Sequence, residues 1–241
     1  MAKRRLSAIF FDIDDTLYST TEFTSRARAA GLRAMIAAGL PVSFEEACAE
    51  MDEIVREGSS NDEHQFDKLV LRLGGAAVSA RRRPLLVAAG VVAYHDTKFR
   101  HLTPYEDALE VLKRLVARHS VRLGIISAGV GLKQAEKVVR LGLAEFFDPE
   151  AVFISDEVGI DKTNPKLYRH VCVQLALAPD AVMVVGDHPL RDVDPPNAVG
   201  MITVLHQRSG KYQDVAGRTQ PDYVAHNFWD LWEILDRDFA I

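Results

Sequence analysis

The chain is poor in cysteine, with only Cys48 and Cys172 among its 241 residues. Two cysteines form neither a disulfide framework nor a four-ligand zinc site, so both classes are excluded. The two lie far apart in apolar segments of helical pattern. We therefore expect reduced, buried thiols, as is usual in the cytoplasm.

A long apolar run is also missing. The mainly apolar residues 6–11 stop at Asp12, whereas a signal peptide needs an apolar region of about 7–15 residues. No run approaches the roughly 18–20 residues that span a bilayer. We expect a cytoplasmic protein with no membrane partner.

Basic residues are not in excess, since 29 Lys and Arg face 34 Asp and Glu and give a net charge of -5. A general nucleic-acid binder usually carries a strong basic excess, so that class is excluded. Apolar residues at 48% and charged residues at 26% are typical of a globular protein. We expect a small-molecule partner, and the sequence leaves monomer and homodimer open.

What is present is an alternation of apolar and amphipathic segments. Short apolar runs predict strands at 6–11, 121–126, 181–185 and 201–205, with weaker signals at 151–154 and 223–225. Helical periodicity covers 105–118, 131–141 and 165–177, and the second of these places its apolar stripe at Leu132, Ala135, Val138, Val139 and Leu141. The pattern predicts an α/β fold, a Rossmann-like doubly wound parallel sheet covered by helices on both faces.

One stretch, residues 19–100, interrupts this alternation. It contains no convincing strand and predicts helices at about 21–38, 43–57, 62–74 and 81–95. We expect an all-helical insert at 19–100, set into a core formed by residues 1–18 and 101–241.

Two carboxylates, Asp12 and Asp14, follow the first predicted strand. In an open parallel sheet, ligands bind beyond the carboxyl ends of the strands. Carboxylates held close together there repel each other unless a cation or a proton relieves them. An acidic turn is the simpler explanation for an isolated Asp-x-Asp, so this pair alone does not define a site.

Other polar side chains at strand and loop ends favour a functional site over a simple acidic turn. Ser127 ends the second strand, Asp187 follows the third, and Asp192 lies five residues further on. Lys162 precedes the third strand. Each residue alone has an ordinary structural explanation, but their order and spacing together indicate an active site.

These groups suit phosphoryl transfer. We expect three catalytic residues, with Asp12 as the nucleophile, Asp14 as the acid and base, and Lys162 neutralising charge. Mg²⁺ is the expected cofactor, because oxygen ligands from Asp12, Asp187 and the backbone carbonyl of Asp14 suit a hard cation. Further phosphate contacts are expected from Ser127, Ala128, Lys162 and Thr16. Asp192 is expected to orient Lys162 or a metal-bound water, and the sequence leaves open whether it also binds the metal directly.

The motifs resemble those of the haloacid dehalogenase-like superfamily of hydrolases. Asp12-Ile13-Asp14-Asp15-Thr16 matches its Asp-x-Asp-x-Thr motif, and Ser127, Lys162 and Gly186-Asp187 with Asp192 are similar to the other three. The resemblance implies that the helical insert is a C1-type cap. It also implies an Mg²⁺-dependent phosphatase acting on a small phosphorylated metabolite such as a sugar or glycolytic phosphate.

The third motif departs from the family pattern. Members often have Lys-Pro-Asp-Pro, whereas this chain has Lys162-Thr163-Asn164-Pro165. Asn164 can still cap the next helix. Lys166 competes for the lysine role, and we favour Lys162 because Pro165 places Lys166 inside the helix.

Three other functions stay open: a 2-haloacid dehalogenase, a phosphomutase and a non-catalytic binding module. Asp14 argues against the dehalogenase, since a leaving halide needs no proton. The sequence separates a mutase poorly from a hydrolase. Tyr18, Thr20 and Phe23 follow the first motif as candidate substrate contacts, although packing or plain surface is favoured for each.

Overall fold

The computed structural model describes residues 3–58, 62, 64–208 and 210–241. The chain divides into two compact units. The first comprises Met1–Thr21 and Thr103–Ile241, and the second Glu22–Leu102. Each unit has a hydrophobic core of its own, formed in one case around a sheet and in the other between helices.

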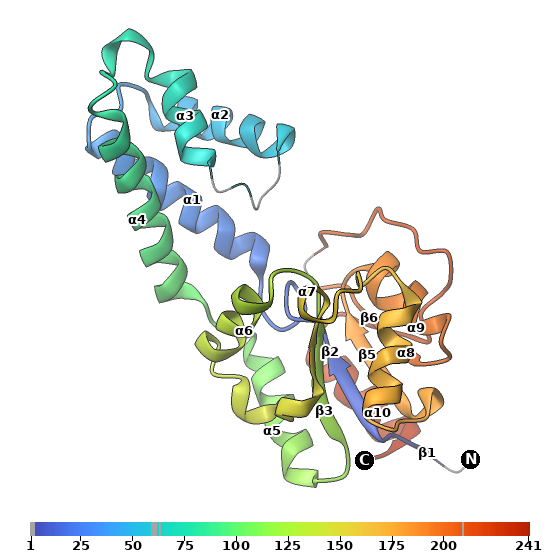
Figure 1. The fold of residues 1–241 in the computed structure, drawn as a ribbon. Helices are drawn as coiled ribbons and strands as arrows, with labels where there is room; N and C mark the ends of the chain where they lie inside the picture. The colour runs from blue at the N-terminus through green and yellow to red at the C-terminus, as the bar shows by residue number, and fades with distance from the viewer. Residues whose placement is uncertain (1–2, 59–61, 63, 209) are drawn as a thin grey trace. The chain divides into compact units, whose positions relative to one another are not determined.

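The first unit contains a parallel sheet of six strands in the order β4-β3-β2-β5-β6-β7 (Figure 1). All six predicted strands are present, as β2 (Ala8–Phe11), β3 (Arg122–Ser127), β4 (Val152–Ile154), β5 (Val182–Gly186), β6 (Ile202–His206) and β7 (Tyr223–Ala225). From β2 the chain adds β3 and then β4 toward one edge of the sheet, and from β5 it adds β6 and then β7 toward the other edge. This is the Rossmann-type order, in which ligands bind where the direction reverses.

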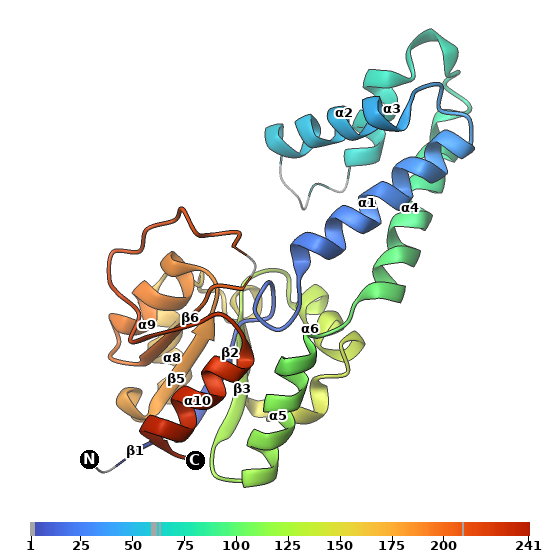
Figure 2. The same cartoon turned by 180° about the vertical axis from the view of Figure 1, so that it is seen from behind.

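Helices cover both faces of this sheet, which confirms the doubly wound prediction. α5 (Glu106–Arg118) and α10 (Phe228–Asp238) lie on one face, and α8 (Pro165–Gln174) and α9 (Asp194–Asn197) on the other (Figures 1 and 2). The remaining helices of the unit are α6 (Gly131–Arg140) and α7 (Ser155–Val158). Short 3₁₀ turns occupy Ala144–Phe146, Pro149–Ala151 and Pro179–Ala181. A small parallel pair, β1 (Arg4–Arg5) with β8 (Phe239–Ala240), was not predicted.

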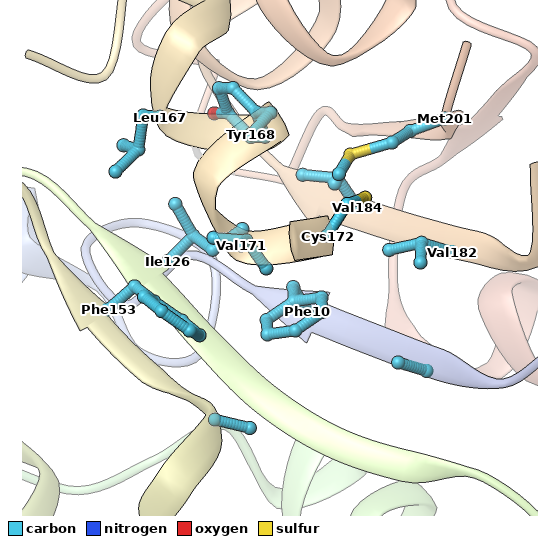
Figure 3. Close-up of a cluster of buried hydrophobic side chains, with 12 residues drawn as sticks. Phe10, Ile126, Phe153, Leu167, Tyr168, Val171, Cys172, Val182, Val184 and Met201 are labelled. Atoms are coloured by element: carbon cyan, nitrogen blue, oxygen red, sulfur yellow. The ribbon is translucent and has the colours of Figure 1, made fainter. Parts of the chain in front are cut away.

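The core between the sheet and α8 fixes the strands that carry the site. Phe10 of β2 and Val184 of β5 pack in one buried cluster with Tyr168 and Val171 of α8 (Figure 3). Strands buried on both faces are expected to be continuously apolar, and β2, β5 and β6 are buried at every position. These apolar runs end where the polar site residues begin.

The apolar stripe predicted for α6 is only partly correct, because Val138 and Leu141 are buried as predicted but Leu132, Ala135 and Val139 are exposed. Leu132 and Val139 are 80% and 68% exposed, whereas Gln134 is only 5% exposed. The buried face of α6 instead carries Gly131, Gln134 and Val138. This face meets the loop after β2, where Gln134 hydrogen-bonds a carboxylate, so a polar side chain is required there.

The second unit is all-helical over its described residues. Its helices are α1 (Thr20–Ala37, which begins in the first unit), α2 (Phe44–Glu57), α3 (Gln65–Leu73) and α4 (Arg83–His101), with a 3₁₀ turn at Gly75–Ala77. Ser43 and Glu46 form a capping box that fixes the start of α2. Gly31 is needed for close packing, because a Cβ there would lie 2.7 Å from the Phe66 ring. None of the described helices in either unit is long and apolar enough to cross a membrane.

Candidate active site

The strand register brings the predicted site residues to one level. Phe11 of β2 pairs with Ile125 of β3 and Val185 of β5. Asp12 follows Phe11 directly, and Ser127 and Asp187 lie two residues beyond Ile125 and Val185, so all three lie at the carboxyl edge of the sheet. The edge coincides with the reversal of strand order between β2 and β5, where ligands bind in such sheets.

Four of the predicted residues form a buried inner cluster, defined here as Asp12, Lys162, Asp187 and Asp192. Lys162 Nζ lies 2.5 Å from Asp12 Oδ1 and 2.6 Å from Asp192 Oδ1. Carboxylate oxygens of the three aspartates lie within 4.8 Å of one another. All four residues are at least nine-tenths buried.

Lys162 reaches this cluster from the loop before α8. Asn164 caps that helix, as predicted, because its Oδ1 accepts a 3.0 Å hydrogen bond from Lys166 N. Lys166 itself is exposed on α8, whereas Lys162 is 1% exposed. The competing lysine therefore does not lie in the inner cluster.

Asp192 lies in a π-helical turn, Pro189–Val193, a rare conformation that recurs at functional sites. Tyr168 OH donates a 2.5 Å hydrogen bond to the Arg191 carbonyl and holds this turn against α8. Asp192 Oδ2 accepts from His188 N at 3.0 Å. Gly186 leaves room for the carboxylate, because a Cβ at Gly186 would lie 2.2 Å from Asp192 Cγ.

The charges of the inner cluster do not balance. Three carboxylates share one ammonium, which leaves two negative charges in excess when all are ionised. Burial, opposed in part by Lys162, raises the pKa of Asp12 to about 6. Burial together with the charge of Asp12 raises the pKa of Asp187 to about 9. Burial alone would lower the pKa of Lys162, but the carboxylates of Asp12 and Asp192 outweigh it and raise that pKa.

A divalent cation fits this set of donors. Its charge equals the excess, and carboxylate oxygens are the ligands that Mg²⁺ prefers. Asp187 Oδ2 is buried and finds no hydrogen-bond partner within the described part of the chain. A buried carboxylate oxygen without a partner is costly unless a cation or a proton satisfies it. Two arrangements of ligands are therefore possible. Either all three carboxylates (Asp12, Asp187 and Asp192) hold the metal, or two of them hold it and the third steadies Lys162.

Asp14 points into different surroundings, which we call the outer cluster: Asp14, Tyr18, Gln134 and Lys137. Lys137 Nζ lies 2.7 Å from both carboxylate oxygens of Asp14. Tyr18 OH donates to Oδ1 at 2.5 Å, and Gln134 Nε2 donates to Oδ2 at 3.2 Å. The side chains of Lys137 and Asp14 are 19% and 32% exposed, so solvent still reaches this pair.

Burial favours the neutral form of Asp14, but Lys137 and the other donors outweigh it and lower its pKa. Asp14 is therefore ionised in the free protein. The sequence did not single out Lys137 or Gln134. Their spacing of three residues places them on one face of a helix, and that was the available signal.

Two predicted phosphate contacts, Ser127 and Thr16, offer hydroxyl groups at this edge. Both are buried, and neither hydroxyl has a hydrogen-bond partner among the residues with described placement. An unsatisfied buried hydroxyl is costly, so an incoming oxyanion would stabilise both. The Ala128 carbonyl accepts a 2.6 Å hydrogen bond from Gln134 Nε2, which fixes the loop after Ser127.

Asp15 fixes the loop that carries Asp12 and Asp14. Its backbone is left-handed, with φ 56°, a conformation that aspartate tolerates better than most residues. Its buried carboxylate accepts hydrogen bonds from Thr20 N at 2.8 Å and Lys211 Nζ at 2.8 Å. The sequence showed Asp15 only as part of the motif, because Lys211 is 196 residues away.

The chain is similar in sequence to known hydrolases. A family model of haloacid dehalogenase-like hydrolases matches residues 6–200. The glyceraldehyde 3-phosphate phosphatase of Methanopyrus kandleri is 42% identical over 219 residues, covering 90% of this chain and 90% of that protein. The enzyme of the same name from Methanocaldococcus jannaschii is 34% identical, covering 95% of this chain and 97% of its own. The chain belongs to the haloacid dehalogenase-like hydrolases, and within that family it is a phosphatase.

Solved structures show the same fold. A phosphatase of this family from Thermococcus onnurineus superposes with a TM-score of 0.64 at 23% identity, covering 98% of this chain and 100% of that one. A 2-haloacid dehalogenase from Pseudomonas syringae gives 0.61 at 25% identity, covering 96% and 99%. One fold thus serves both reactions, so the fold by itself does not distinguish a phosphatase from a dehalogenase. The predicted family, fold class and enzyme class are confirmed.

Proposed function

We propose that this chain is an Mg²⁺-dependent phosphatase that hydrolyses a small phosphorylated sugar through an aspartyl-phosphate intermediate on Asp12. The observation that carries the proposal is the inner cluster. It combines a buried carboxylate next to an ammonium with two further carboxylates whose excess charge suits a divalent cation.

In the first step, a carboxylate oxygen of Asp12 attacks phosphorus. The bond from phosphorus to the sugar oxygen breaks, and that oxygen leaves with the bonding electrons. Asp14 in its protonated form gives the leaving oxygen a proton. Asp14 is ionised in the free protein, but the negative charge of a bound phosphate favours its protonated form.

In the second step, water attacks the phosphorus of the aspartyl phosphate. Asp14, now a carboxylate, accepts the proton that the water loses. The bond between phosphorus and the Asp12 oxygen breaks, which releases inorganic phosphate and restores the Asp12 carboxylate. Asp14 thus recovers in the second step the proton that it gave in the first.

The residues around Asp12 offset the charge of the phosphate. Lys162 supplies an ammonium, and the hydroxyls of Ser127 and Thr16 with the backbone N–H of Ala128 supply neutral donors. A divalent cation held by Asp12, Asp187 and the backbone carbonyl of Asp14 would add positive charge that reduces repulsion between carboxylates and phosphate. We assign Asp192 to steadying Lys162, a role supported by the 2.6 Å contact between them.

For the substrate we propose a triose phosphate, with glyceraldehyde 3-phosphate as the first compound to test. The support is that relatives of that name align with nine-tenths or more of this chain at 34–42% identity. We further propose that the helical unit Glu22–Leu102 serves as the cap that selects the substrate.

A dehalogenase is the alternative that the family name suggests. A leaving halide needs no proton, and an ionised Asp14 held by three donors would then have no function. A phosphomutase uses the same first step and returns the phosphoryl group to a sugar. Product analysis separates these outcomes, since only the hydrolase releases inorganic phosphate.

The test is a panel of phosphorylated metabolites assayed with Mg²⁺, with Asp12→Asn as the blank. We expect phosphate release from glyceraldehyde 3-phosphate by the wild-type chain, and none by Asp12→Asn or after EDTA. Halide release from a 2-haloacid that persists in EDTA would contradict the proposal. So would full activity of Asp12→Asn.

A further inference from the structure

The outer cluster contains a lysine that no step above uses. Three side chains donate to Asp14, and two of them, Gln134 and Lys137, come from α6. The ammonium of Lys137 is equidistant from both carboxylate oxygens, at 2.7 Å. A pair of contacts of this kind restrains rotation of the carboxylate about its Cβ–Cγ bond.

We propose that Lys137, supported by Gln134, is a positioning residue that holds the Asp14 carboxylate where it exchanges a proton with the leaving oxygen and with water. The inference rests on the proposed function, because it assumes the acid and base role of Asp14. Lys137 itself is not assigned a contact with substrate.

Gln134 ties this arrangement to the phosphate side of the site. Its Nε2 donates to Asp14 Oδ2 at 3.2 Å and to the Ala128 carbonyl at 2.6 Å. Ala128 follows Ser127 directly, so one amide group spans the acid and the loop that carries a phosphate contact. Gln134 is buried although it lies on an amphipathic helix, which a purely structural helix face would not require.

The chemistry of the leaving group offers a readout for this role. An alkoxide is a strong base, so breaking its bond to phosphorus benefits strongly from a positioned acid, which contributes about 10²–10⁴-fold in rate. A nitrophenolate is a weak base and leaves without a proton. A misplaced Asp14 therefore slows hydrolysis of an alkyl phosphate much more than hydrolysis of an aryl phosphate, whereas a damaged fold slows both alike.

The experiment measures kcat/KM with Mg²⁺ for sn-glycerol 3-phosphate or glyceraldehyde 3-phosphate, and for p-nitrophenyl phosphate. We expect Lys137→Met to lose at least about tenfold on the alkyl phosphate and less than about threefold on the aryl phosphate. Lys137→Arg should recover most of the loss, because a guanidinium also bonds both carboxylate oxygens. Lys113→Met, an exposed lysine on α5, is the matched control and should leave both rates unchanged.

Asp14→Asn separates a failure of this inference from a failure of the proposed function. If Asp14→Asn discriminates between the two substrates but Lys137→Met loses equally on both, or on neither, the role of Lys137 is overturned and the proposed function stands. If Asp14→Asn hydrolyses the alkyl phosphate at the wild-type rate, the acid role of Asp14 is contradicted, and the inference fails with it.

Discussion

Asp12 and Asp14 lie two residues apart on one loop, yet their carboxylates occupy opposite surroundings. In the inner cluster the side chains of Asp12 and Lys162 are 9% and 2% exposed, and burial raises the pKa of Asp12 to about 6. In the outer cluster those of Asp14 and Lys137 are 32% and 19% exposed, and the donors lower the pKa of Asp14. Each cluster contains one lysine, and the difference between them lies in burial and in the number of carboxylates around it.

This difference matches the two roles that we propose for the site. The inner cluster holds several carboxylates away from solvent. A cation would offset their negative charge, and a phosphate would bind beside that cation and Lys162. The outer cluster pairs one carboxylate with one ammonium near solvent, where protons enter and leave readily. Under the proposed mechanism, the surroundings of two chemically identical side chains give them different roles, as in other enzymes with paired carboxylates.

The largest effect is expected from a substitution in the inner cluster. Asp187→Asn removes a carboxylate from the proposed cation site, and we expect phosphate release to fall by at least about 10²-fold at low Mg²⁺, with partial recovery as Mg²⁺ is raised. The measurement is a titration of activity with Mg²⁺ after EDTA treatment. Lys137→Met, which alters only the outer cluster, should keep the wild-type half-saturating Mg²⁺ concentration. An unchanged titration for Asp187→Asn would contradict the assignment.

A smaller effect is expected on the free energy of unfolding, where the loss caused by substituting Lys162 can be compared with the loss caused by substituting Lys137. Lys162→Met leaves buried carboxylates without their ammonium and should cost about 3 kcal/mol. Lys137→Met breaks a partly exposed pair and should cost at most about 1 kcal/mol. Urea unfolding near neutral pH without divalent cations measures both values, and equal losses would show that the clusters do not differ as described.

The dependence of the free energy of unfolding on pH gives a second test of the contribution from the pair of Lys137 and Asp14. A lowered pKa for Asp14 means that its pairing stabilises the fold above the ordinary aspartate pKa of 3.8 and ceases to do so as pH falls through the lower folded value. The stability difference between wild type and Lys137→Met should therefore narrow below about pH 4. A difference that widens there would have the wrong sign.

The smallest effect concerns Tyr18, which donates one of the hydrogen bonds to Asp14. Tyr18→Phe leaves Lys137 in place, so we expect kcat/KM for the alkyl phosphate to fall by only about fivefold, the factor that corresponds to one hydrogen bond of about 1 kcal/mol. Steady-state kinetics of Tyr18→Phe and Lys137→Met, measured under the same conditions, shows which substitution causes the larger loss. A larger loss in Tyr18→Phe than in Lys137→Met would place the main restraint on Asp14 elsewhere.

The inner cluster was largely predictable because it lies where apolar runs stop. Asp12 and Asp187 follow the buried strands β2 and β5, and parallel strands end at a common edge. Lys162 was preferred over Lys166 from the position of a proline alone, and the structure places Lys162 2.5 Å from Asp12. Strand ends and helix starts are local features, so a single sequence carries them.

The outer cluster was not predictable in the same way. Lys137 and Asp14 are 123 residues apart, and a lysine on an amphipathic helix normally marks the solvent face. Of the apolar stripe predicted for α6, the fold buries Val138 but leaves Leu132 and Val139 exposed, so the pattern did not identify Gln134 as a buried residue. Which helix face meets a polar loop depends on tertiary packing, and periodicity does not report it.

The most direct test of the central claim is to trap the phosphorylated aspartate. Wild-type enzyme is mixed with Mg²⁺ and substrate, quenched in acid during turnover, and treated with borohydride, which reduces an aspartyl phosphate to homoserine. Mass spectrometry of the peptide containing Asp12 and Asp14 then locates the change. We expect homoserine at position 12 and none in the absence of substrate. Homoserine at position 14, or turnover in which residue 12 is never modified, would contradict it.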